Sequence, residues 1–188
     1  IQIPSTVGDG LSYTNTIAAG ALKTDQGNST AAASAILNTR LPTVTKTVSP
    51  ASVVQGQTAT FTITLQNTNN PTAATITSFT DNLTTLDAGG QFVVANSPGA
   101  TSNCVGSTVS AVPGGTSVTL TGGSIPASGS CTITLPVVPR AGISAGSKSN
   151  TLQIGALQTS QGSNLAAVSS SVTVNPSLTC GKAYSPTT

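Results

Sequence analysis

Hydrophobic and polar residues alternate along several short segments of this chain. Between Thr58 and Gln66, the residues Phe61, Ile63 and Leu65 fall on one face, and Thr fills the positions between them. A period of two with Thr on the second face predicts a half-buried β-strand. Other predicted strands lie at residues 44–48, 76–79, 92–95, 108–112, 118–120, 131–137 and 168–174. The pattern therefore indicates an all-β fold.

Turn-forming residues separate these strands. The first strand is stopped by Ser49-Pro50, residues 67–71 are rich in Asn, and the pairs Gly114-Gly115 and Gly122-Gly123 both predict hairpin turns. Short strands that recur about every 8–12 residues between such turns are typical of two packed antiparallel sheets. We therefore expect an antiparallel β-sandwich that is immunoglobulin-like in the broad sense.

An internal repeat organises the chain. The segment from Asn15 reads NTIAAGALKTDQGNSTAAASAIL, and the segment from Asn150 reads NTLQIGALQTSQGSNLAAVSSSV. Eight residues match at a constant offset of 135, beginning with Asn15 against Asn150, and Lys46 matches Lys182 at an offset of 136. A self-similarity this long and nearly ungapped predicts a structural repeat of about 136 residues.

The repeat predicts three parts. Residues 43–174 are expected to form one complete sandwich. Residues 1–41 look like the closing strands of a preceding repeat, and residues 178–188 look like the opening strand of a following one. Two arrangements remain open: the chain is a window of a tandem array, or it is a subunit whose additional terminal strands are shared with its neighbours.

Composition excludes several functions. The chain has 188 residues, six Lys or Arg, four acidic residues and no His, Met or Trp, whereas 33 Thr and 25 Ser make up nearly a third of it. Without His there is no Ser-His or Cys-His nucleophile pair and no imidazole metal ligand. A net charge of +2 provides no basic stripe for nucleic acid, and no apolar stretch is long enough to span a membrane. We expect a protein that is not an enzyme and binds no metal or cofactor.

Three cysteines bear on the compartment. Cys104 and Cys131 flank a hairpin-like stretch, so they either form a disulfide that closes a loop of 28 residues or remain two buried thiols. A disulfide is the expectation for a Ser/Thr-rich chain of the exported kind, which places the protein outside the cell. Cys180 is then left over. An odd cysteine indicates either an intersubunit thiol or a chain cut within a repeat.

Several segments together resemble a known family. VTKTVSPASVVQGQTATFTITLQNTN from Val44, SFTDNL from Ser78, IPASGSCTITLPV from Ile125 and the later SNTL and TSQG are similar to the DUF11-like repeat modules of large bacterial surface proteins. The resemblance covers residues 43–174 fully and both flanks in part. It implies immunoglobulin-like sandwiches strung in tandem, with extracellular stalk, fibre or adhesin roles and no catalytic residues.

Lys46 on the first predicted strand and Asn150 near the start of a late one have a candidate role, and both recur in the repeat, as Lys182 and Asn15. Some surface modules with immunoglobulin-like folds join such a pair by an isopeptide bond that a buried acid assists, and Asp81 is the candidate acid here. A plain Lys–Asp ion pair, or an Asn side chain bonded to the backbone of a turn, explains the same residues.

These observations lead to a functional expectation. Leu22, Ile36 and Leu37 of the N-terminal segment need a partner surface, because an isolated hairpin is marginal in water. We expect an extracellular structural repeat or subunit that assembles with copies of itself into a surface filament or stalk by β-strand addition. The alternatives are an adhesin module that binds a surface glycan or protein, and a passive spacer.

Overall fold

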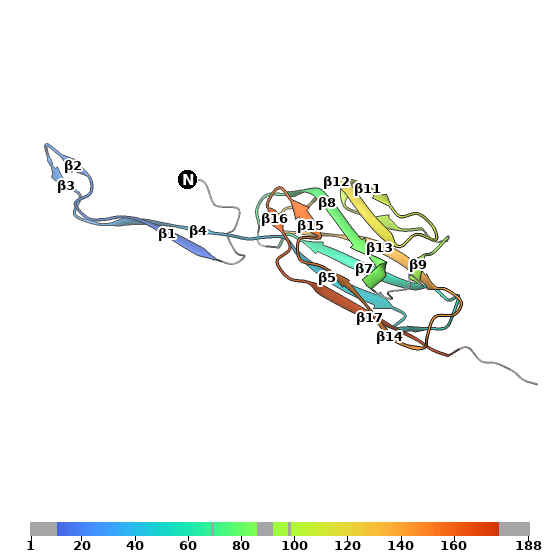
Figure 1. The fold of residues 1–188 in the computed structure, drawn as a ribbon. Coiled ribbons are helices and arrows are strands. Elements are labelled where there is room, and N and C mark those ends of the chain that lie inside the picture. The colour runs from blue at the N-terminus through green and yellow to red at the C-terminus, as the bar shows by residue number, and fades with distance from the viewer. Residues whose placement is uncertain (1–10, 69, 86–91, 98, 177–188) are drawn as a thin grey trace, which may run out of the picture.

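Short strands form nearly all the regular structure of the protein, as Figure 1 shows for a computed structural model that describes residues 11–68, 70–85, 92–97 and 99–176. An N-terminal group of strands comprises β1 (Ser12–Ile17), β2 (Lys23–Thr24), β3 (Gly27–Asn28) and β4 (Ala33–Asn38). The following strands are β5 (Thr43–Ser49), β6 (Ser52–Val53), β7 (Ala59–Gln66), β8 (Ala74–Asn82), β9 (Phe92–Val94), β10 (Thr101–Ser102), β11 (Val105–Ser110), β12 (Ser117–Ile125), β13 (Ser130–Pro139), β14 (Gly146–Leu152), β15 (Leu157–Thr159), β16 (Gly162–Ser163) and β17 (Val168–Val174). One 3₁₀ turn, η1 (Leu83–Thr85), follows β8.

Strands β5 to β17 make a sandwich. One sheet has the order β10-β13-β7-β5, with β9 added alongside β13, and the other has the order β11-β12-β8-β15-β16. A third sheet, β14-β17-β6, lies along one edge, because β17 contacts β5 while β14 contacts β8 and η1. Pairing is antiparallel except between β17 and β6. The prediction of an all-β antiparallel sandwich is confirmed, and its immunoglobulin-like character stays a prediction.

The core follows the alternation seen in the sequence. Phe61, Ile63 and Leu65 of β7 are fully buried, and they lie opposite Leu135, Ile133 and Cys131 of β13 in the antiparallel register. Side chains of both sheets complete the same hydrophobic cluster, among them Phe79 of β8 and Leu120 of β12. Period-two alternation thus places one apolar row of each strand between the sheets.

One turn prediction was wrong. Gly114-Gly115 does connect β11 to β12, but Gly122-Gly123 lies inside β12, which continues to pair with β8 beyond it. Both glycines have positive φ, 65° and 81°, and a Cβ on Gly123 would lie only 2.7 Å from Cβ of Ser107. The pair therefore accommodates a close approach of β11 to β12 within the sheet instead of reversing the chain.

Strands β1 to β4 repeat the closing strands β14 to β17 pairing for pairing. The β1–β4 register runs from Ser12 opposite Asn38 to Ile17 opposite Ala33, and adding 135 gives the β14–β17 register from Ser147 to Leu152. The β2–β3 register is likewise that of β15–β16 moved by 135. Similarity of sequence and identity of pairing thus agree over residues 12–38, which we call the N-terminal hairpin.

The connecting turns repeat as well. Gly20 and Gly155 have φ of 80° and 75°, and Gly27 and Gly162 have φ of 122° and 116°. Thr24 Oγ1 donates to the Gly27 carbonyl at 2.9 Å, as Thr159 Oγ1 donates to the Gly162 carbonyl at 2.8 Å. The N-terminal hairpin is therefore folded as a closing unit, yet in Figure 1 it extends away from the sandwich.

Candidate functional site

A buried cluster of three polar side chains lies inside the sandwich. Lys46 Nζ contacts Asp81 Oδ2 and Asn150 Oδ1, so it forms an ion pair with the first and donates a hydrogen bond to the second. The side chains of Lys46 and Asp81 have no exposed surface, and Asn150 is 0% exposed. The structure thus brings together the three residues that the sequence singled out, from strands far apart in the chain.

Strand alternation explains why these polar side chains point inward. Lys46 lies on β5 between Val44 and Val48, Asp81 follows Phe79 by two residues on β8, and Asn150 precedes Leu152 by two on β14. Each polar residue therefore occupies a position where its strand otherwise presents an apolar side chain to the core. Polar side chains that contact each other thus occupy three inward-facing strand positions.

The surroundings of the lysine are largely apolar. The ring centroid of Phe61 lies 4.8 Å from Lys46 Nζ, a favourable cation–π distance. Burial lowers the pKa of Lys46 from its ordinary value of 10.5, while the negative charge and the hydrogen bond of Asp81 act in the opposite direction. Because burial lowers this pKa, Lys46 loses its proton to become the neutral amine more readily than a solvated lysine does.

The other two members are held by further contacts. Asn150 Nδ2 donates a hydrogen bond to the Asn82 carbonyl at 2.9 Å, which orients its amide oxygen toward Lys46. Asp81 Oδ1 is buried and has no hydrogen-bond partner. An unsatisfied buried oxygen typically costs about 1–3 kcal/mol, so its presence here calls for a chemical reason.

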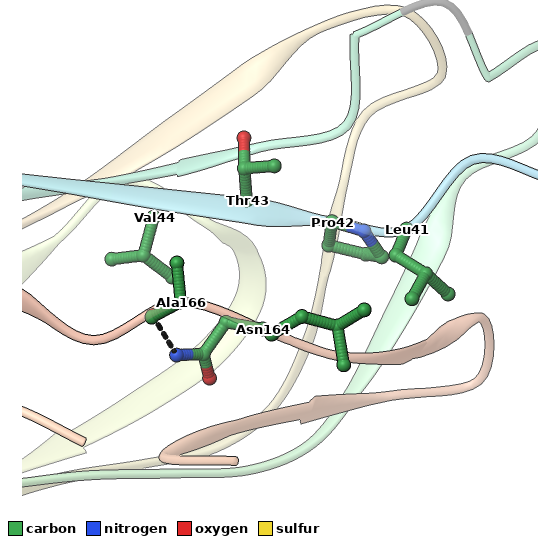
Figure 2. Close-up of a pocket in the computed structure, with 7 residues that line it drawn as sticks. Leu41, Pro42, Thr43, Val44, Asn164 and Ala166 are labelled. Carbon is green, nitrogen blue, oxygen red and sulfur yellow. Dashed lines mark hydrogen bonds between the residues drawn. The ribbon is translucent and has the colours of Figure 1, made fainter. Parts of the chain in front are cut away.

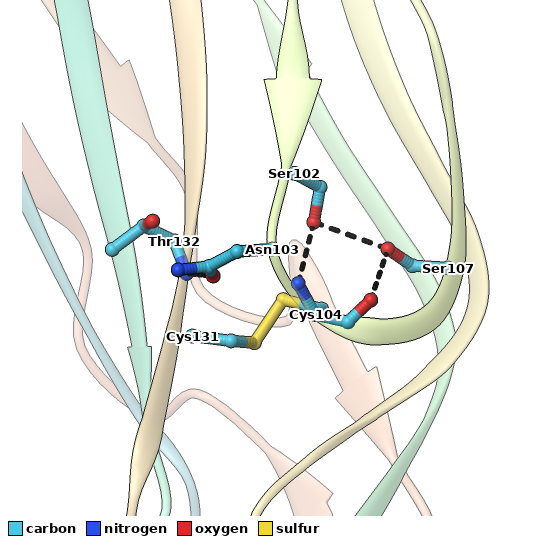
Figure 3. The surroundings of a disulfide bond; sticks show 6 residues. All are labelled: Ser102, Asn103, Cys104, Ser107, Cys131 and Thr132. Atoms are coloured by element: carbon cyan, nitrogen blue, oxygen red, sulfur yellow. Dashed lines mark hydrogen bonds between the residues drawn. A yellow bond between two sulfur atoms is a disulfide. The ribbon is translucent and has the colours of Figure 1, made fainter.

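The predicted cysteine pair also lies together. Cys104 and Cys131 form a disulfide with an S–S distance of 2.01 Å, shown in Figure 3. Ser102 Oγ accepts a hydrogen bond from the Cys104 N–H at 3.0 Å, and Ser107 Oγ donates to the Cys104 carbonyl at 2.8 Å. Cys104 follows β10 of one sheet and precedes β11 of the other, so the bond anchors this crossover to β13. Cys180 lies outside the described residues.

A small groove lies where the N-terminal hairpin joins the sandwich. Its volume is about 140 Å³, and it is lined by Leu41, Pro42, Thr43, Val44, Asn164, Leu165 and Ala166 (Figure 2). Asn164 Nδ2 donates to the Ala166 carbonyl at 2.9 Å on one wall. No aromatic side chain lines this groove, so it offers no stacking surface for a sugar.

The hairpin residues expected to take part in assembly are exposed. Leu22 is 62% exposed, Leu37 is 43% and Ile36 is 65%. The repeat offset separates them, since Leu22 and Leu37 correspond to the buried Leu157 and Val172, whereas Ile36 corresponds to the outward-facing Ser171. Leu22 and Leu37 are thus in core-facing positions, and Ile36 is not.

Sequence reasoning missed one of these positions. Ile17 is 55% exposed, and it corresponds to Leu152, which is 1% exposed. The repeat offset of 135 could have identified it, because it aligns Ile17 with Leu152. Ile17 follows Asn15 by two residues and so lies on the same face of its strand, as Leu152 does relative to Asn150. The core-facing row of the N-terminal hairpin therefore comprises Ile17, Leu22 and Leu37.

Fold and site together define a class of protein. It is a β-sandwich domain with a buried Lys–Asp–Asn cluster, preceded by a second copy of its closing strands whose core-facing side chains are exposed. The model of the family described as "Domain of unknown function (DUF7933)" matches residues 42–174, and the chain belongs to this family. The match nearly coincides with the sandwich expected at 43–174. The resemblance to DUF11-like modules remains a resemblance, since the family that matches is a different one.

Other comparisons are distant. A crystal structure from Corynebacterium diphtheriae, of a protein described as membrane anchored, is 12% identical with a TM-score of 0.48, and the alignment covers 93% of this chain. The chain spans 46% of that protein's length. No curated protein sequence matches the chain. Within the described residues, no helix has the length and apolar character needed to cross a membrane, and no three His, Cys, Asp or Glu side chains gather as metal ligands.

Proposed function

We propose that the protein is an extracellular structural repeat or subunit, without enzymatic activity, whose N-terminal hairpin closes an adjoining sandwich of the same kind. Repetition of this joint would build a surface stalk or filament by addition of strands between neighbours. The observation that carries the proposal is the correspondence of β1–β4 with β14–β17, register for register, in a hairpin whose core-facing side chains are exposed.

Energetics favour a partner for the N-terminal hairpin. Burial of an Ile or Leu side chain stabilises by about 1.5–3 kcal/mol, and the hairpin exposes Ile17, Leu22 and Leu37 together. A two-stranded hairpin with no such burial is marginal in water. An adjoining sandwich of the same kind would cover this row where the hairpin takes the place of its closing strands by strand exchange, as the sandwich core covers Leu152, Leu157 and Val172.

The extracellular location is supported by two features. The Cys104–Cys131 disulfide is of the kind that persists in oxidising compartments, and the chain is rich in Ser and Thr but poor in charge. Copies of the chain, or of the same repeat, are the partners that the hairpin geometry favours over a glycan or an unrelated protein.

Electron microscopy and sedimentation of the full chain test the proposal. We expect beaded rods or filaments that disappear when residues 1–41 are deleted, with residues 43–174 still folded. Leu37→Asp should prevent assembly, because it places a charge in a core-facing position. Ile36→Asp is the matched control on the outward face and should leave assembly intact. Assemblies that survive the deletion, or a full chain that stays monomeric at all concentrations, would contradict the proposal.

A further inference from the structure

We propose that Lys46 and Asn150 become joined by an intramolecular isopeptide bond between Nζ of the lysine and Cγ of the asparagine, with Asp81 transferring the protons. The inference does not depend on the proposed role of the N-terminal hairpin, because its residues belong to β5, β8 and β14 of the sandwich.

Geometry is the first argument. The amine, the carboxyl and the amide are in mutual contact through Lys46 Nζ, and the fold alone holds them there, since the lysine and asparagine are 104 positions apart in sequence. When the fold holds two reacting groups in contact, their reaction does not have to overcome the entropic cost of bringing them together. Both side chains are buried among the strands that position them.

Desolvation is the second argument. Lys46 and Asp81 are both fully buried, and a buried ion pair is stable only with excellent geometry and satisfied partners. Asp81 Oδ1 lacks a partner, so the ionised form of this pair leaves an acceptor unsatisfied. Transfer of the lysine proton to Asp81 removes both buried charges and yields a neutral amine beside a carboxylic acid. The neutral amine is the nucleophilic form of lysine.

The reaction balances without any oxidant or cofactor. The Lys46 Nζ lone pair attacks Asn150 Cγ, the new C–N bond forms, and the C=O electron pair moves onto Oδ1. Asp81, which holds the proton received from the lysine, donates it to Nδ2 of the amide, and the resulting carboxylate accepts a proton from the attacking nitrogen. The Cγ–Nδ2 bond then breaks, the carbonyl re-forms and ammonia leaves. The lysine amine and the asparagine amide become one secondary amide, and the carboxyl of Asp81 is regenerated.

The position of the bond has a mechanical consequence. It would connect β5, the first strand of the sandwich, to β14, the partner of its last strand β17. Tension applied along the chain at the two ends of the sandwich would then pass through the Lys46–Asn150 bond. The strands between these residues in sequence, including most of the core, would carry no load.

Intact mass of the purified full chain is the direct test. Loss of ammonia lowers the mass by about 17 Da relative to the sequence with its disulfide formed, since the step releases one NH₃ per bond. Protease digestion and tandem mass spectrometry should recover a branched peptide joining Lys46 to Asn150. This peptide distinguishes the bond from a cyclised asparagine elsewhere, which loses the same mass.

Variants assign the roles. Lys46→Met and Asp81→Asn should both restore the full mass and abolish the branched peptide. Lys148→Met, at a partly exposed lysine on the same strand as Asn150, is the matched control and should keep the mass deficit. A full mass for the folded wild-type chain overturns the proposal, whether or not the variants fold. So does a deficit that persists in Lys46→Met.

Discussion

The repeat provides a pair of leucines at equivalent positions with opposite exposure. Leu157 is 0% exposed and belongs to the hydrophobic core, whereas its counterpart Leu22 in the N-terminal hairpin is 62% exposed. Leu157→Ala and Leu22→Ala remove the same atoms from the same local strand pattern. The two variants therefore differ only in whether the leucine has a sandwich to pack against.

The expected effects differ several-fold. A buried Leu→Ala substitution costs about 2–5 kcal/mol through lost burial and a residual cavity. With a denaturant slope of about 4 kcal/mol per molar in guanidinium chloride, a loss of about 3 kcal/mol lowers the unfolding midpoint by about 0.8 M. Substitution at an exposed surface position usually stays within about 0.5 kcal/mol, so Leu22→Ala should leave the midpoint nearly unchanged.

Guanidinium unfolding of the full chain, followed by far-ultraviolet circular dichroism at low protein concentration, measures both midpoints. Low concentration keeps the chains unassembled, so that Leu22 has no partner. If Leu22→Ala lowered the midpoint as much as Leu157→Ala, the hairpin would already be packed within its own chain. The reasoning that assigns it to an adjoining sandwich would then be refuted.

Three further substitutions or treatments test the sandwich itself. Reduction of the Cys104–Cys131 disulfide, which closes a 28-residue loop, should lower the free energy of unfolding by about 3.6 kcal/mol, seen as a lower midpoint with reductant than without. Gly162→Ala should destabilise the sandwich by about 1–3 kcal/mol, because φ is 116° there and a Cβ would lie 2.6 Å from Leu41 Cδ2. The equivalent substitution in the N-terminal hairpin, Gly27→Ala, should leave the unfolding midpoint of the sandwich unchanged. Asn164→Ala should cost about 1–3 kcal/mol in thermal unfolding, because its side chain accepts from one backbone N–H and donates to two carbonyls.

Strand alternation predicted the fold where burial is one-sided. Residues 59–66 and 130–135 alternate cleanly, so their apolar rows identify the core without any tertiary information. Gly122-Gly123 misled the prediction, because a glycine pair has the same composition in a turn and within a continuous strand. The difference lies in the neighbouring strand β11, whose approach near Ser107 is a tertiary fact that no local pattern contains.

The sequence identified the three residues of the buried cluster, Lys46, Asp81 and Asn150, as candidates. It did not show that their side chains are in contact. Lys46 lies between Val44 and Val48, so its inward direction was readable. Contact with Asp81 and Asn150 depends on how β5, β8 and β14 meet across different sheets. Ile17 shows the converse case, since the repeat register alone would have identified it as core-facing.

Grafting tests the central claim, that the N-terminal hairpin is a closing unit for a sandwich of this kind. In the full chain, residues 147–173 are replaced by a copy of residues 12–38, so that Ile17, Leu22 and Leu37 take the places of Leu152, Leu157 and Val172. Hydrogen exchange and guanidinium unfolding then report whether the grafted strands join the core. We predict one cooperative transition and slow exchange in the grafted strands, both lost when the graft carries Leu22→Asp. A graft that leaves the sandwich unfolded, or that tolerates Leu22→Asp without loss of stability, would contradict the account.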